Sequence, residues 1–180
     1  MIVTLPAANI MDLAERYAGH RHTPCSREEL RKLQALAPRL AELGCTRIVC
    51  SDLDAQSGDA LARRLNVPVI EWESLRRFNA GKHHGRYTAD VDATRERIAA
   101  PDVPIKGGDS RISFDKRIAA AHQRLLAEPL TTLVIADEEV LAKLTGAEGA
   151  IRYHIYQVEL KGVNSGSADE TTALRTATAG

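Results

Sequence analysis

Residues 46–70 read TRIVCSDLDAQSGDALARRLNVPVI, and this stretch decides the fold. Thr46–Cys50 is a compact apolar run typical of a buried strand, and Val67–Ile70 is a second one. Between them, Asp54–Leu65 is predicted to form a helix. A strand, a helix and another strand in succession predict two parallel strands, because a parallel pair needs a crossover connection. The sequence therefore predicts an α/β fold.

The segment before this unit is predicted to contain a strand, a loop and a long helix. Met1–Leu5 is an apolar run that ends at Pro6, which lacks the N–H group needed to continue a strand ladder. A helix is predicted over residues 26–44, because Ser26 and a glutamate three positions later match a capping box and leucines follow at helical spacing. Pro38 interrupts this pattern, so we expect the helix to bend or split there.

The segment after this unit first loses its periodicity and then becomes regular again. Residues 77–104 predict a long excursion with one helix around residues 92–98. Further elements are predicted to be a helix over Ser110–Ala127, a strand over Thr131–Ala136, a helix over Glu138–Leu144 and a strand over Arg152–Glu159. The sheet is expected to end there. Residues 163–180 are small and polar and predict a flexible tail, which leaves one α/β domain over residues 1–162.

The composition excludes several classes of protein. A chain of 180 residues with 44% hydrophobic content can bury one core, and its 24 basic residues equal its 24 acidic ones. This balance gives no indication of a nucleic-acid partner. The three cysteines show neither disulfide nor metal-ligand spacing, and no window approaches the roughly 18 apolar residues of a membrane span. We expect a cytoplasmic protein with no cofactor, no metal and no membrane contact.

Five segments resemble, in the same order and spacing, those of one protein family. They are residues 16–19 (RYAG), residues 50–53 (CSDL), Leu75-Arg76 followed by Gly81 and Gly85, residues 108–110 (GDS) followed by Arg117, and residues 133–136 (LVIA) before Val140. Together they resemble the histidine phosphatase (phosphoglycerate mutase-like) superfamily over about residues 1–160. The resemblance implies a three-layer α/β/α sandwich with a mostly parallel central sheet. It also implies a site at the carboxyl ends of the strands.

The residues that this family uses for chemistry are changed at every matched position. The matched positions hold Leu5, Pro6, Ala7, Ser57, Arg77 and Asp137. The first three stand where the resemblance implies an R-H-G motif, whose histidine is the nucleophile, and none of them can attack phosphorus. Asp137 stands in place of a second histidine, Ser57 of an arginine, and Arg77 of a proton-donating glutamate. We therefore expect no catalytic residue there, and we predict an ion pair between Asp137 and Arg77 across the vacated site.

Several polar residues remain candidates for binding a ligand. They are Asn9, Arg16, Arg21, His22, Arg77, His83, His84 and Asp137. His83 and His84 stand in the densest cationic stretch and could bind an anion, although a solvated loop is the favoured interpretation. They are not expected to bind a metal, because adjacent side chains rarely converge on one ion. Residues 21–23 (RHT) superficially resemble the R-H motif, but no buried strand precedes them, which favours an exposed loop.

Three other residues receive structural interpretations. Asp109 is interpreted as part of the loop and cap before a helix. Cys25 is interpreted as a passive surface thiol, because no activating group is evident beside it. Trp72 is interpreted as a core or rim residue after a strand.

The sequence therefore favours a catalytically inactive member of this family whose cleft is a binding or regulatory surface. Its ligand would be a small anion or a protein partner, and a homodimer is a further option. The main alternative is an active phosphatase or phosphomutase that uses a displaced histidine, His22 or His84. A third hypothesis is an enzyme of unrelated chemistry on the same scaffold.

Overall fold

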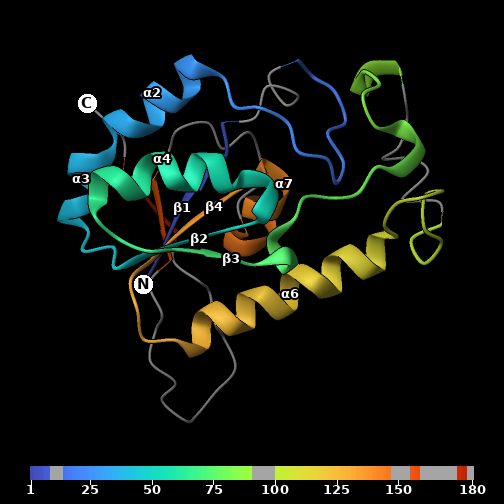
Figure 1. The fold of residues 1–180 in the computed structure, drawn as a ribbon. Coiled ribbons are helices and arrows are strands. Elements are labelled where there is room, and N and C mark those ends of the chain that lie inside the picture. The colour runs from blue at the N-terminus through green and yellow to red at the C-terminus, as the bar shows by residue number, and fades with distance from the viewer. Residues whose placement is uncertain (9–13, 91–99, 147–154, 159–173, 178–180) are drawn as a thin grey trace, which may run out of the picture.

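A six-stranded sheet in the order β3-β2-β4-β1-β5-β6 forms the centre of the molecule (Figure 1). The computed structural model describes residues 1–8, 14–90, 100–146, 155–158 and 174–177. The strands are β1 (Ile2–Pro6), β2 (Arg47–Cys50), β3 (Val69–Glu71), β4 (Thr132–Ala136), β5 (Ile155–Val158) and β6 (Leu174–Ala177). The pairings from β3 to β1 are parallel, whereas β5 and β6 pair antiparallel. The predicted mostly parallel sheet is confirmed.

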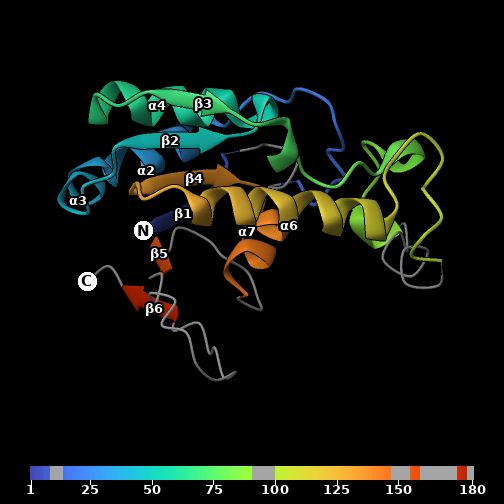
Figure 2. The ribbon, with the colours of Figure 1, turned by 90° about the horizontal axis from the view of Figure 1, so that it is seen from below.

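Helices cover both faces of this sheet, which gives the predicted three layers (Figure 2). Side chains of α2, α3 and α4 pack on one face, and those of α6 and α7 pack on the other. The helices are α2 (Arg27–Ala35), α3 (Ala37–Glu42), α4 (Ala55–Leu65), α6 (Arg111–Ala127) and α7 (Glu138–Thr145). Short 3₁₀ turns lie at Asp52–Asp54, Glu73–Leu75, Gly81–His83 and Thr88–Asp90.

The apolar runs of the strands supply both cores. In β1, Val3 and Leu5 belong to the core beneath α2, α3 and α4, whereas Ile2 belongs to the core beneath α6 and α7. Successive side chains of a strand point to opposite faces, so a strand covered on both sides needs apolar residues almost throughout. β1 and β4 are buried at every position, which explains why they have no polar alternation.

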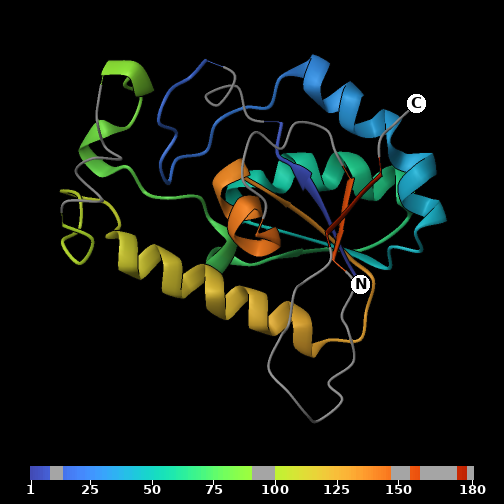
Figure 3. The same cartoon turned by 180° about the vertical axis from the view of Figure 1, so that it is seen from behind.

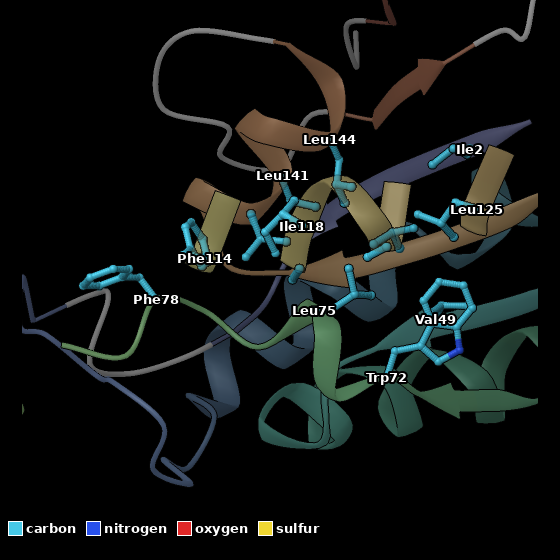
Figure 4. Packing of buried hydrophobic residues seen from close by; sticks show 14 of the residues in the cluster. Ile2, Val49, Trp72, Leu75, Phe78, Phe114, Ile118, Leu125, Leu141 and Leu144 are labelled. Atoms are coloured by element: carbon cyan, nitrogen blue, oxygen red, sulfur yellow. The ribbon is translucent and has the colours of Figure 1, made fainter. Parts of the chain in front are cut away.

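The core beneath α6 and α7 is built around large side chains (Figure 4). Phe114 and Ile118 of α6 and Leu141 of α7 are almost completely buried there. Trp72, directly after β3, is 4% exposed, and the guanidinium of Arg124 lies 3.9 Å from its ring centroid. The interpretation of Trp72 as a core or rim residue is confirmed.

The helix predicted over residues 26–44 is split, as its proline indicated. α2 ends and α3 begins around Leu36, with Pro38 in the first turn of α3. Proline is tolerated there because first-turn N–H groups have no acceptor within the helix. The hydroxyl of Ser26 caps α2 by accepting from the N–H of Glu29 at 3.5 Å. Gly44, at φ +67°, follows the end of α3 as predicted.

The C-terminal part of the sheet differs from the prediction. The sheet does not end with β5, because β6 pairs with it from within the range predicted to be a flexible tail. An edge strand offers unpaired N–H and C=O groups, so a polar segment can pair with it without burying apolar side chains. The division of the chain at residue 162 stays a prediction. The helix predicted around residues 92–98 lies outside the described residues.

Within the described ranges, none of the helices combines the length and the apolar character that crossing a membrane requires.

Candidate functional site

A cleft of about 390 Å³ lies where the carboxyl ends of parallel strands meet. Ala7, Ser51 and Asp137 directly follow β1, β2 and β4. The cleft is lined by residues 15–19, by Arg77 and Phe78, by Thr88, and by residues 137–139 at the start of α7. Open α/β sheets bind their ligands at this edge. The cleft is therefore the candidate site that the resemblance predicted.

Arg77, which lines the cleft, belongs to a buried ion pair. Nη2 of Arg77 donates to Oδ1 of Asp54 at 2.7 Å, and the hydroxyl of Ser51 donates to Oδ2 of Asp54 at 2.6 Å. Burial raises the pKa of Asp54, while Arg77 and Ser51 act in the opposite direction. Neither side chain of the pair is more than 4% exposed. The guanidinium is thus held inside the protein by a carboxylate of the same chain.

Asp137 is the N-cap residue of α7, which lies beside the ends of β1 and β4 (Figure 3). Its Oδ1 accepts from the N–H of Glu139 at 2.9 Å. Burial raises the pKa of Asp137, and the positive charge of Arg77 lowers it in part. The two groups therefore interact electrostatically, but the 2.7 Å partner of Arg77 is Asp54. A direct ion pair between Arg77 and Asp137 stays a prediction.

The main chain that carries Arg77 is held by side chains from elsewhere in the fold. Arg117 of α6 donates to the carbonyls of Ser74 at 3.1 Å and Arg76 at 2.5 Å. Nε2 of His20 donates to the carbonyl of Arg77 at 2.7 Å. These contacts fix the turn after β3 and thereby place the Arg77 guanidinium against its partner.

Asp109 belongs to this network and lies in the loop directly before the cap of α6, as the sequence predicted. It accepts from the N–H of Asn79 at 3.0 Å and pairs with Arg117 at 2.9 Å. The cap of α6 is Ser110, which forms a reciprocal capping box with Ser113. Ser110 caps the helix, while the carboxylate of Asp109 faces the half-buried Arg117.

The outer wall of the cleft consists of two segments that pair with each other. Residues 15–17 and 85–88 exchange main-chain hydrogen bonds, including Tyr17 N–H to the Arg86 carbonyl at 3.0 Å and Thr88 N–H to the Glu15 carbonyl at 2.8 Å. The guanidinium of Arg16 donates to the Gly85 carbonyl at 2.6 Å and lies 3.7 Å from the Tyr87 ring centroid. Arg16 thus stabilises the wall by a carbonyl contact and a cation–π contact.

The positions matched to the family's R-H-G motif and first arginine are filled by short or apolar groups. Leu5 and Pro6 are buried within β1, and the N–H of Ala7 donates to the Ala136 carbonyl at 3.0 Å. Ser57 is fully buried, and its hydroxyl accepts from the N–H of Ala8 at 3.1 Å. No cationic side chain occupies these four positions.

Cys25 lies beside this region and is less exposed than predicted. Its Sγ lies 3.3 Å from the Ser57 hydroxyl, and the residue is half-buried. Burial raises the pKa of the Cys25 thiol, so the reactive thiolate is disfavoured. The interpretation as a passive thiol agrees with this environment.

The predicted binding candidates fall into different places. Arg16, Arg77 and Asp137 line the cleft. Arg21 and His22 are exposed, and His22 lines a separate groove with Asp52 and Glu71. Asn9 lies outside the described residues.

The expectation of a solvated loop at His83 and His84 is wrong for His83, which is only 6% exposed. Its ring lies 6.4 Å from that of Tyr17, and Nδ1 of His84 donates to the Ala18 carbonyl at 2.5 Å. The cause is a close crossing of two main-chain segments. They approach so closely that a Cβ on Gly81 would collide with the carbonyl of Lys106. The crossing pulls this cationic stretch into the fold.

Sequence reasoning missed the pairing role of Asp54 and the capping role of Asp137. The second had a signal, because an aspartate followed by two glutamates and an apolar run is a typical helix start. The first had none, since Asp54 and Arg77 are joined only by the fold. In the described part of the chain, no three His, Cys, Asp or Glu side chains gather as a metal site would require.

Solved structures share this fold over nearly the whole chain. "Mycobacterial hydrolase 1" superposes with a TM-score of 0.73 at 21% identity, covering 98% of this chain and 96% of that one. Mycobacterial glucosyl-3-phosphoglycerate phosphatase in complex with VO3 gives 0.70 at 20% identity, covering 97% and 96%. Bacillus stearothermophilus YhfR gives 0.72 at 15% identity, covering 90% and 93%. At these identities the likeness concerns the fold alone.

Comparison of sequences identifies the family. Among curated proteins, no sequence matches the chain. The family model of the histidine phosphatase superfamily (branch 1) matches residues 9–150, so the match begins after Leu5, Pro6 and Ala7. It includes the segments that position Arg77 and Asp137 at the cleft. The chain belongs to the histidine phosphatase superfamily (branch 1).

Proposed function

We propose that this chain is a non-catalytic member of the superfamily whose cleft serves as a binding or regulatory site. One observation carries the proposal: Arg77, which lines the cleft, is already bound at 2.7 Å by the buried carboxylate of Asp54. A phosphoryl group placed there would have to compete with an internal anion. It would also meet the carboxylate of Asp137, and like charges repel strongly where water is scarce.

The described lining of the cleft supports the same proposal. Among the described residues that line the cleft, none is a histidine. His22 lines a different groove, and His84 is engaged with the Ala18 carbonyl. A phosphohistidine mechanism needs an imidazole directed at the substrate phosphorus. The alternative of an active phosphatase with a displaced histidine is therefore not favoured.

The solved relatives supply a contrast for the test. Mycobacterial glucosyl-3-phosphoglycerate phosphatase has solved structures in complex with VO3 and with inorganic phosphate. The present chain shares the fold of these structures but pairs its Arg77 internally. We therefore expect neither turnover of phosphomonoesters nor stabilisation by phosphate.

The experiment measures release of phosphate from p-nitrophenyl phosphate and a panel of phosphomonoesters, from acid to neutral pH. Loss of a nucleophile lowers turnover in a well-studied hydrolase by about 10⁶, so we expect release at the level of a protein-free blank. An active histidine phosphatase assayed in parallel is the positive control. The variants His22→Ala and His84→Ala are assayed beside the unmodified chain. Turnover that either variant abolishes would refute the proposal and select the displaced-histidine mechanism.

A further inference from the structure

Residues 86–90, which we call the strap, form a part of the cleft wall that neither hydrophobic core holds in place. All five residues are exposed, and Thr88 lines the cleft. Among the described residues, the side chains of both cores come from other parts of the chain. Segments with few buried apolar contacts open locally at a lower free energy than unfolding of the whole domain requires. The strap therefore meets the physical condition for local opening.

Contacts with residues 15–17 hold the strap against the rest of the wall. The main-chain N–H and the hydroxyl of Thr88 both donate to the carbonyl of Glu15, at 2.8 and 3.1 Å. The guanidinium of Arg16 lies 3.7 Å from the ring centroid of Tyr87. These contacts lie near the surface, where water competes for each donor and acceptor, so each adds only a small net stabilisation. Together they keep the strap closed, and the loss of one should be measurable.

The chain directly before the strap is anchored and then reaches a point where it can turn. His83 is only 6% exposed, and His84 donates to the Ala18 carbonyl at 2.5 Å. Gly85 follows at φ +77°, with no heavy atom within 4 Å of the place that a Cβ would take. Glycine adopts either sign of φ at little cost. The main chain can therefore turn at Gly85 while the two histidines stay in place.

Glu15, on the other side of the contact, has a strained main chain. Its φ is +53°, a left-handed conformation that costs free energy for any residue with a Cβ. Such a conformation persists only where surrounding contacts compensate it, and it is often found in segments that switch. Here the carbonyl of the exposed Glu15 accepts both bonds from Thr88. When those bonds break, Glu15 is free to relax, so its strain favours the open form.

We propose that the strap turns about Gly85 to open and close the cleft, and that Arg16 latches it in the closed form. Opening removes Thr88 from the cleft lining and gives a ligand access to the interior. This inference concerns access to the proposed binding site. It rests on that proposed function, because a closing element matters only for a cleft that binds a ligand.

Amide hydrogen exchange of the full chain, followed by NMR, tests the proposal. The N–H groups of Tyr17 and Thr88 bond across the contact and are freed when the strap opens. After correction for intrinsic rates, they should exchange at least about 100-fold faster than those of the central strand β4. Arg16→Met should accelerate their exchange about tenfold, because it removes a charged hydrogen bond and a cation–π contact. Arg21→Met is the matched control, since it removes the same charge from an exposed residue and should change nothing.

A second pair of variants isolates the strain at residue 15. Glu15→Gly removes the left-handed cost and should slow the exchange of the Thr88 N–H about threefold, whereas Glu15→Ala keeps the cost and should leave it unchanged. Three results would each overturn the inference: equal protection of Thr88 and β4, equal exchange in Arg16→Met and Arg21→Met, or equal exchange in the two Glu15 variants. Turnover of phosphomonoesters is measured separately and would instead overturn the proposed function.

Discussion

Nη2 of Arg77 lies 2.7 Å from Oδ1 of Asp54, and the two side chains are only 4% and 1% exposed. The resemblance implies a proton-donating glutamate at position 77, so the sign of the charge there is reversed. The reversal is compensated within the chain, because Asp54 supplies the counter-charge and Ser51 hydrogen bonds to it. A buried charge is tolerated only with such partners. The remodelled site is therefore a self-contained ionic cluster.

Removing the guanidinium should be costly at neutral pH. Arg77→Met leaves Asp54 buried without its counter-charge, and breaking a buried pair costs about 3–5 kcal/mol in the free energy of unfolding. Arg76→Met is the matched control, because Arg76 pairs with Asp52 at 2.7 Å but is 27% exposed. That change should cost no more than about 1 kcal/mol. Urea unfolding of both variants measures the difference. Equal losses in the free energy of unfolding would show that the buried pair stabilises the fold no more than the exposed pair does.

The pKa of Asp137 gives a pH dependence with a definite sign. Burial raises this pKa in the folded chain, so the folded state binds a proton more tightly than the unfolded state does. The stability that this provides is present below the unfolded pKa of about 3.9 and is lost as pH rises through the folded pKa. Asp137→Asn has no such loss. Its stability relative to the unmodified chain should therefore increase from about pH 4 upward in urea unfolding. A relative stability that falls with pH would mean that the carboxylate is stabilised in its charged form.

The main-chain segments that contain Gly81 and Gly108 cross so closely that we expect no side chain to be tolerated at Gly108. A Cβ on Gly108 would collide with the carbonyl of Asn79, and main-chain atoms cannot move aside without distorting the loop. We expect Gly108→Ala to lower the free energy of unfolding by more than about 3 kcal/mol. Gly85→Ala is the control, because Gly85 has φ +77° but no heavy atom within 4 Å of the place that a Cβ would take. Its cost should be only the left-handed strain, about 1–2 kcal/mol. Equal costs in thermal unfolding would contradict the crowding explanation.

Arg117 should matter for stability more than another arginine of the same helix. Arg117→Met removes the donor to the carbonyls of Ser74 and Arg76 and the partner of Asp109, at a cost of about 2–4 kcal/mol. Arg111→Met, near the start of α6, removes ion pairs of a side chain that is 35% exposed and should cost about 1 kcal/mol or less. Denaturant midpoints of the two variants provide the measurement. A cost for Arg111→Met as large as that for Arg117→Met would argue against the network that positions the turn.

The fold was predictable because its strands leave few alternatives. β1 and β4 are buried throughout and apolar except for one threonine each, as a strand covered on both faces requires. Pro38 correctly indicated a split helix. The failures have physical causes. β6 has no apolar pattern because edge pairing uses the main chain, and His83 is buried because two glycines let distant segments cross. Neither effect is visible in local sequence.

The site was predictable in position but not in its pairings. The family register correctly placed Arg77 and Asp137 at one cleft. It did not indicate that Asp54 would be the close partner of Arg77, because which of several acids meets a guanidinium depends on side-chain geometry after folding. A small anion or a protein partner as ligand stays a prediction, and three of the residues named for it, Arg16, Arg77 and Asp137, line the cleft. The acidic and basic residues of the cleft lie far apart in the sequence, and only the fold brings residues 15–19 and 137–139 together.

Intact-mass analysis of the chain, quenched during incubation with p-nitrophenyl phosphate, tests the central claim most directly. A histidine phosphatase forms a covalent phosphoryl adduct as its intermediate, and an acid-sensitive adduct is preserved by quenching at alkaline pH. We predict that the mass of this chain stays unchanged while an active member of the superfamily shows the adduct. A mass increase of one phosphoryl group, located on any histidine of this chain, would contradict the account.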